Sequence, residues 1–89
     1  MEVTYRQSFL KDLRNLRGTS VYARIYELAF AELVKIETSQ DIPNIKALKG
    51  YSDYYRIRIG DYRIGIEIFG DQVEIIRVLH RREFYRYFP

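Results

Sequence analysis

The stretch "YYRIRIGDYRIGIEI", residues 54–68, decides the fold because it alternates apolar and polar residues, turns, and alternates again. Alternation over this length is typical of half-buried β-strands. Between the two halves, Gly60-Asp61 is a two-residue hairpin signal with glycine first, which suits a type II′ turn. Gly70-Asp71 is a second pair of this kind. We therefore predict a meander with strands at about 54–59, 62–69 and 72–79.

The register of the first hairpin follows from its two-residue turn, which sets Ile59 opposite Tyr62. Cross-strand partners share a face of the sheet. One face then carries the side chains of a core wall: Tyr55, Ile57, Ile59, Tyr62, Ile64 and Ile66. The other face carries Tyr54, Arg56, Arg58, Arg63, Gly65 and Glu67. A slip of one residue would turn arginines into the core, so this pairing is well specified.

Two helices are expected before the meander. A short strand in "EVTYRQ" (residues 2–7) precedes a helix for which Ser8 is the expected cap and Gly18 the expected stop. Thr19 or Ser20 is the expected cap of a longer second helix, in which apolar residues recur at helical spacing. A polar segment that contains a proline ends this second helix.

The order of these elements predicts one α+β domain over residues 1–89. Its β-α-α-β-β-β order places two N-terminal helices on one face of a small, mainly antiparallel sheet. With no cysteine and one histidine, the chain has no disulfide framework, and we expect neither a metal site nor a cofactor. The N-terminus lacks an apolar signal core and no apolar run reaches membrane length, so we expect a cytoplasmic protein without membrane contact.

The basic residues are distributed unevenly. The net charge is only +3, but eleven arginines stand against four lysines, and residues 51–89 hold seven arginines, no lysine and nine of the fourteen aromatic residues. Arginine among tyrosines is typical of a nucleic-acid surface, because the guanidinium group suits phosphates and stacks on rings. The alternative interpretation is a solvated sheet face with snorkelling side chains, neutralised by nearby acids such as Glu67.

The predicted register sets Arg58 directly opposite Arg63. Like charges in this position are unfavourable by tenths of a kcal/mol up to ~1 kcal/mol. The pair makes sense if an anion lies between the two side chains. Gly65, beside Arg56, removes a side chain and is expected to leave a hollow floor. We therefore predict a shallow concave site with three guanidinium groups aimed at phosphate.

The last strand and the segment after it leave alternatives open. With a two-residue loop at 70–71, Arg77 would point at the helices, whereas a bulge would bring it to the arginine face. His80 is the one side chain with an unperturbed pKa near neutrality, and it is either catalytic or structural. Tyr85 can stack on a base or exchange a proton, and the alternative is core packing with Phe84 and Phe88.

"LKGYSDYYRIRIGDYRIGIEI" (residues 48–68) followed by "VLHRREFY" (residues 78–85) resembles the RelE/ParE superfamily of bacterial and archaeal type II toxins. The likeness spans nearly the whole chain. It implies a compact sheet with two helices and a separately encoded antitoxin, which such toxins commonly join on operator DNA. RelE-type members enter the ribosomal A site and cut the mRNA there. ParE-like members share the fold, lack the ribonuclease residues and inhibit DNA gyrase.

The resemblance also assigns residues by position. The basic residues that the superfamily carries on its sheet match Arg56, Arg58 and Arg63. The superfamily's arginine after the last strand matches Arg81, and its C-terminal tyrosine matches Tyr85. The best-known member has lysines at the first two of these positions and a longer gap before the tyrosine. Another member takes a glutamate base from the segment where Ile42 and Pro43 lie here. The anion-binding half of the site therefore carries over, and the proton-transfer half does not.

The resemblance implies RNA cleavage without a metal, in which a ribose 2′-OH attacks the adjacent phosphate. The expected catalytic residues are Arg56, Arg58, Arg63, His80, Arg81 and Tyr85. The expected RNA contacts are Lys46, Lys49, Tyr54, Arg77 and Arg82. The base stays open among His80, Tyr85, Lys46, Lys49 and the ribosome itself. Expected partners are the antitoxin, the ribosome with mRNA in its A site, and operator DNA only within the toxin-antitoxin complex. The alternatives are a gyrase inhibitor and a non-catalytic RNA- or protein-binding module.

Overall fold

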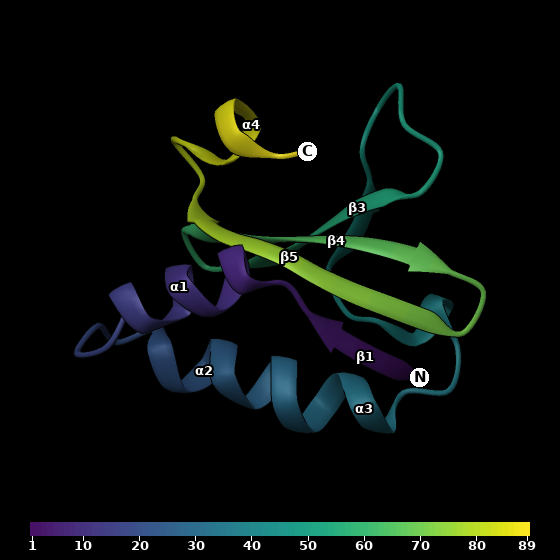
Figure 1. Ribbon diagram of the computed structural model, residues 1–89, viewed down its shortest axis with the longest axis horizontal. Helices are drawn as coiled ribbons and strands as arrows, with labels where there is room; N and C mark the ends of the chain where they lie inside the picture. Colours follow the sequence, from purple (N-terminus) through teal and green to yellow (C-terminus); the bar gives the residue numbers. More distant parts are fainter.

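The computed structural model describes residues 1–89 and contains one five-stranded sheet with helices on both faces (Figure 1). The strands are β1 (Glu2–Tyr5), β2 (Ile45–Ala47), β3 (Tyr54–Ile59), β4 (Tyr62–Phe69) and β5 (Gln72–His80). The helical segments are α1 (Gln7–Asn15), α2 (Tyr22–Glu27), the π-helical η1 (Leu28–Glu32), α3 (Leu33–Lys35), the 3-10 turn η2 (Ser39–Asp41) and α4 (Phe84–Tyr87). The predicted α+β class, with two N-terminal helices on one face, is confirmed.

The sheet has the order β1-β5-β4-β3-β2, in which only the β1–β5 pair is parallel. All six predicted pairs between β3 and β4 are confirmed, including Arg58 opposite Arg63. Gly60 and Gly70 both have positive φ values, 55° and 56°, and the aspartates after them do not. This is the pattern of a type II′ turn, and it fixes the register of both hairpins.

A bulge in β5 resolves the alternatives for Arg77. Gly65 pairs with Arg77 and Ile66 pairs with Ile75, so Ile76 is the extra residue. The loop at 70–71 has two residues, as one alternative required, but the mid-strand bulge still turns Arg77 to the face of Gly65.

The predicted helix caps are wrong. The N-cap positions are Arg6 and Val21, and neither makes a side-chain cap hydrogen bond. The Ser8 hydroxyl instead donates to the Ile76 carbonyl at 2.6 Å, which fastens α1 to the edge of β5 beyond its pairing with β1. The Thr19 hydroxyl donates back to the Leu16 carbonyl, so it closes the end of the first helix. At Ser8, a tertiary contact therefore overrides the local preference for a cap.

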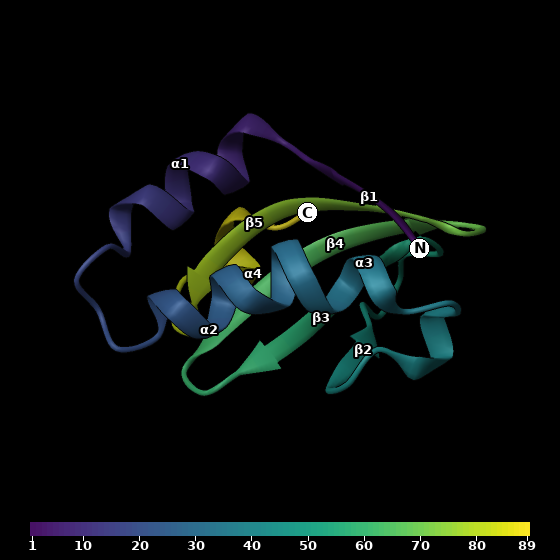
Figure 2. The same cartoon turned by 90° about the horizontal axis from the view of Figure 1, so that it is seen from below.

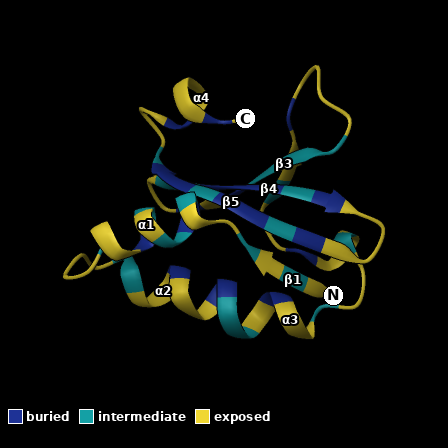
Figure 3. Cartoon of the chain, viewed as in Figure 1, coloured by how far each residue is buried: buried dark blue, intermediate teal, exposed yellow.

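Seen from below, α2, η1 and α3 run as one helix across the sheet (Figure 2), and the core lies beneath them. This main core contains fifteen buried residues, among them Phe9, Ile25, Leu33, Ile57 and Ile64. Figure 3 shows several consecutive buried positions in β4 and β5, among them residues 64–66, 75–76 and 78–79, as expected for strands covered on both faces. None of the helices is both long and apolar enough to cross a membrane.

A second, smaller core lies on the other face of the sheet. It consists of Leu48, Ile76, Leu79, Phe84 and Phe88, with Tyr54 packed against it. The segment after β5 folds back over the sheet, and the Phe88 ring covers Gly65 so closely that a Cβ there would lie 2.6 Å from its Cδ1 atom. The predicted hollow floor beside Arg56 is therefore wrong, because an aromatic ring fills it.

Candidate functional site

The strands bring four basic side chains to the face opposite the main core, and a fifth, Arg81, follows β5 close enough to act on Arg63. Lys46 on β2 pairs with Arg56 on β3, and Arg58 on β3 pairs with Arg63 on β4. Arg81, directly after β5, is tied to the turn before β4, because its backbone N–H donates to the Asp61 carbonyl at 2.7 Å. Partners in register share a face. We call Lys46, Arg56, Arg58, Arg63 and Arg81 the basic cluster.

The three sheet arginines of the basic cluster have no carboxylate partner. The chain forms three ion pairs, namely Arg6–Glu74, Arg77–Asp12 and Arg81–Asp61. Arg56 and Arg63 donate instead to backbone carbonyls of Asn44, Gly60 and Tyr62, at 2.9 to 3.0 Å. Carbonyl groups orient a guanidinium without cancelling its charge. The alternative interpretation, in which acids such as Glu67 neutralise these arginines, is not observed.

The charges of the basic cluster act on one another at Arg63. Burial lowers the pKa of this guanidinium, and the positive charges of Arg56, Arg58 and Arg81 lower it further, while Tyr85 acts in the opposite direction. A bound anion would relieve this repulsion. The Arg81–Asp61 pair is solvent-exposed, with 3.4 Å between its charged atoms, so it withdraws little charge from the cluster.

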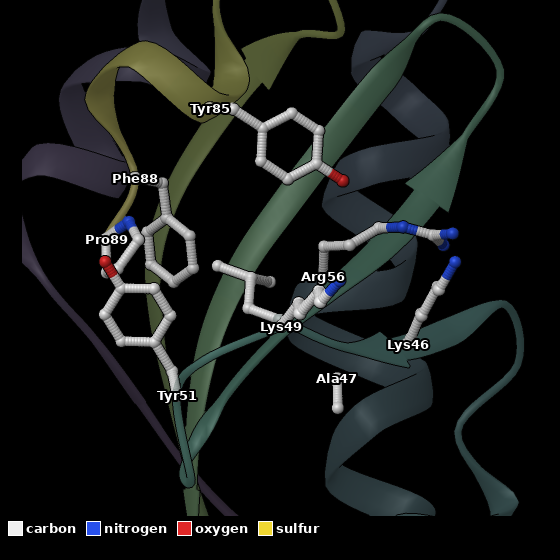
Figure 4. A pocket seen from close by; sticks show the side chains of 9 residues that line it. Lys46, Ala47, Lys49, Tyr51, Arg56, Tyr85, Phe88 and Pro89 are labelled. Atoms are coloured by element: carbon white, nitrogen blue, oxygen red, sulfur yellow. The ribbon is translucent and has the colours of Figure 1, made fainter.

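Tyr85 lies above the basic cluster and is not part of the small core. Its side chain is 65% exposed, although Phe84 and Phe88 on the same segment are buried. The single turn of α4 directs Phe84 to the sheet and Tyr85 outwards, and the two rings meet edge to face at 5.0 Å. In Figure 4 the Tyr85 hydroxyl points over the side of the site where Arg56 lies. The alternative of core packing for Tyr85 is not observed.

A hollow of about 440 Å³ opens between α4 and the β2–β3 connection, beside the basic cluster. Its lining residues are Lys46, Ala47, Leu48, Lys49, Tyr51, Arg56, Tyr85, Phe88 and Pro89. The expected RNA contacts Lys46 and Lys49 both belong to it. Tyr51, which is 51% exposed, was not among the residues expected from the sequence, although its place in a loop favours exposure because loops lie at the surface.

Other expected site residues lie elsewhere. His80 pairs with Tyr62, whose ring packs on the main core, so His80 lies on the helix side of the sheet. Its Nδ1 atom accepts the Arg82 backbone N–H at 3.2 Å. Arg82 is exposed, and its side chain takes part in none of the three ion pairs. Tyr54 is half-buried and packs edge-on against the Phe88 ring at 5.6 Å, which is a structural contact.

Arg77 is held by an acid of this chain. Its Nε and Nη2 atoms donate to the Asp12 carboxylate at 2.7 and 3.0 Å, and this hydrogen bonding raises the pKa of Arg77. Asp12 also accepts the Val78 backbone N–H at 3.1 Å. The bidentate pair joins α1 to β5. Arg77 is therefore not available to the basic cluster, although the bulge turns it to the same face.

Known proteins share the sequence and the fold of this chain. The family model of the ParE toxin of the type II toxin-antitoxin system parDE matches residues 3–85. Toxin RelE3 of Methanocaldococcus jannaschii is 44% identical over 90 residues, which covers 100% of both chains. A chain of the RelB-RelE antitoxin-toxin complex from Methanococcus jannaschii matches with a TM-score of 0.78 and 42% identity, over 97% of this chain and 99% of that one.

A chain of the toxin-antitoxin complex RelBE2 from Mycobacterium tuberculosis matches with a TM-score of 0.70 and 26% identity, over 90% of each chain. The family match spans both the helices and the strands that carry the basic cluster. The resemblance seen in the sequence is thereby confirmed, and the chain belongs to the ParE toxin family as a RelE-like toxin of the type II toxin-antitoxin class.

Proposed function

We propose that this toxin is an endoribonuclease that enters the ribosomal A site and cuts the mRNA there. The proposal rests above all on one observation, the three sheet arginines that share a face and have no carboxylate partner. A folded protein gains nothing from opposing Arg58 with Arg63 unless an anion binds between them. A backbone phosphate of RNA is an anion of the right size for the guanidinium fork.

In the proposed reaction, a ribose 2′-OH attacks the adjacent phosphate, and the products are a 2′,3′-cyclic phosphate and a 5′-OH. Negative charge grows on the phosphorane oxygens, so fixed cations act most strongly in the transition state. Arginine stays protonated at neutral pH and cannot readily act as a base. Arg56, Arg58, Arg63 and Arg81 are therefore the proposed charge clamp.

Proton transfer falls to the residues around the clamp. Tyr85 has an exposed hydroxyl above it, and Lys46 and Lys49 line the adjoining hollow. His80 lies on the other side of the sheet, so we leave it out of the reaction. A ribosome that holds the substrate in line would lower the demand on any base of the toxin.

The proposed partner is a cognate antitoxin. The solved relatives from Methanococcus jannaschii and Mycobacterium tuberculosis are both toxin-antitoxin complexes. An acidic or amphipathic segment could cover the basic cluster, or displace the segment of α4 from the small core of five buried residues. Binding of operator DNA would then belong to the complex rather than to the toxin alone.

The experiment that tests the proposal is the mapping of mRNA 5′ ends after induction in cells, with wild type and Arg63→Ala. Clusters of cuts inside translated codons, lost in Arg63→Ala, are expected, because one such donor is worth about 10²–10³ in rate. Arg17→Ala, an exposed arginine outside the basic cluster, is the matched control and should cut like wild type. Growth arrest that persists in a folded Arg63→Ala protein would refute the nuclease.

The ParE name of the matching family model favours one alternative, inhibition of DNA gyrase. This function needs no clamp around a scissile phosphate. Intact mRNA together with damaged DNA after induction would support it. RNA binding by wild type, with no cut mRNA at any time, would instead support a non-catalytic binding module.

A further inference from the structure

The hollow beside the basic cluster has an aromatic side and a cationic side. Figure 4 shows Tyr51, Phe88 and Pro89 along one wall, and Arg56 and Lys46 at the opposite end. Tyr85 reaches over the space from α4. The hollow has a volume of about 440 Å³, which lies within the range of ~300–1,000 Å³ that is common for small-molecule sites.

The two exposed tyrosines are held in place by packed rings. Tyr51 meets Tyr54 edge to face at 5.7 Å, and Tyr54 meets Phe88 in the same way at 5.6 Å. Phe88 packs on Phe84 at 5.2 Å, and Phe84 meets Tyr85 at 5.0 Å. The chain of five rings thus begins and ends with a side chain at least half exposed, 51% for Tyr51 and 65% for Tyr85. The two tyrosine rings that border the hollow are therefore both preorganised and exposed.

We propose that this hollow binds a base of single-stranded RNA, next to the phosphate that the basic cluster grips. This inference rests on the proposed nuclease function. Arg56 belongs to both sites, since it lines the hollow and lies close enough to Arg63 to lower its pKa. A nucleotide whose phosphate lies on Arg56 and Arg63 therefore has the hollow within reach of its base.

The chemistry of the lining fits a base better than other occupants. Every base has a π-face that stacks on an aromatic ring, so such a platform binds with little sequence preference. Lys46, Lys49 and Arg56 add three cations, and no carboxylate side chain lines the hollow. The cations complement the phosphates that flank a base in an RNA strand. Tyr51 lies outside the strands and takes part in no strand pairing, so we assign it the role of stacking on the base.

The test measures the rate at which a reporter mRNA is cut after induction of the full chain, for wild type and Tyr51 variants. Stacking on one ring corresponds to a change of about 5- to 150-fold, so Tyr51→Ala and Tyr51→Leu should cut more slowly by this factor. Tyr51→Phe should cut like wild type, because stacking needs the ring and not the hydroxyl group. Tyr26→Ala is the matched control, since Tyr26 is 49% exposed on α2, on the helix side.

The outcomes separate this inference from the proposed function. If wild type makes no cuts, both are overturned. If wild type cuts, Arg63→Ala does not, and Tyr51→Leu cuts like wild type, only the base site is overturned. If the Tyr51 variants cut normally but bind the antitoxin more weakly, the hollow holds a peptide and the inference is wrong. Tyr51→Leu keeps an apolar contact with Tyr54, so it decides the matter should Tyr51→Ala not fold.

Discussion

Replacing Gly65 by alanine puts a methyl group into space that the Phe88 ring already occupies. The new Cβ atom would lie 2.6 to 2.7 Å from three atoms of that ring, which is too close for non-bonded carbon atoms. Either the ring shifts within the small core, or it leaves. A strained, overpacked core costs about 1–3 kcal/mol. Loss of a buried phenylalanine side chain costs about 1.5–3 kcal/mol.

Both routes therefore predict that Gly65→Ala lowers the free energy of unfolding by about 1–3 kcal/mol. Each kcal/mol corresponds to roughly 4–8 °C in Tm for a domain of this size. The main core lies on the other face of the sheet and is untouched, so the far-UV circular dichroism of the folded state should stay close to wild type. Urea unfolding of wild type, Gly65→Ala, Phe88→Ala and the double variant measures the effect.

The double variant makes the reasoning refutable. If the clash with Phe88 is the cause, Gly65→Ala should cost little in a chain that already carries Phe88→Ala, and the two single effects should not add. Additive effects, or a Gly65→Ala protein as stable as wild type, would show that the ring does not lie on Gly65. Amide hydrogen exchange in residues 84–88 should rise in Gly65→Ala, because their anchor is loosened.

The remaining predictions concern charges and one partly buried hydroxyl. Arg58→Ala removes the repulsion opposite Arg63, so it should raise the free energy of unfolding by up to ~1 kcal/mol while it weakens mRNA cutting; a less stable variant in thermal melts would contradict this. Asp12→Asn leaves Arg77 without its carboxylate partner and should lower the free energy of unfolding, measured in urea, by about 1–3 kcal/mol. An unchanged free energy of unfolding would show that the ion pair does not stabilise the fold. Burial raises the pKa of Tyr5, so the folded state holds this proton more tightly than the unfolded state does. Stability should therefore fall as the pH rises above about 10, and Tyr5→Phe should reduce this slope in melts at pH 9 to 11; an unchanged slope would exclude Tyr5 as its source.

The meander could be predicted from the sequence because its signals are local. Alternating residues and a glycine with positive φ determine both the turn and the register, so the pairing of Arg58 with Arg63 follows without any tertiary knowledge. The same argument gave the face of the sheet on which the arginines lie. The absence of carboxylate partners could not be predicted, since it depends on which acids the rest of the chain brings near.

Other features depend on contacts between distant segments. The strand β2 has only three residues, and its sequence carries no alternation that marks it. The Ser8 hydroxyl bonds to Ile76, which lies 68 positions away, and the sequence offers a cap as an equally good use for it. Phe88 covers Gly65 only because α4 folds back over the sheet. Interactions of this kind decide where His80 and Tyr85 lie relative to the basic cluster.

The parallel pairing of β1 with β5 has a consequence for how the chain folds. Glu2 lies beside Gln72 and Tyr5 beside Ile75, so the first strand finds its only neighbour about 70 residues later. During synthesis, β1 therefore stays without a partner until the ribosome has made the whole meander. Pairing over such a separation closes a large loop late, which adds an entropic cost and slows folding relative to domains built mainly from local contacts. A nascent toxin thus has an incomplete sheet for most of its translation.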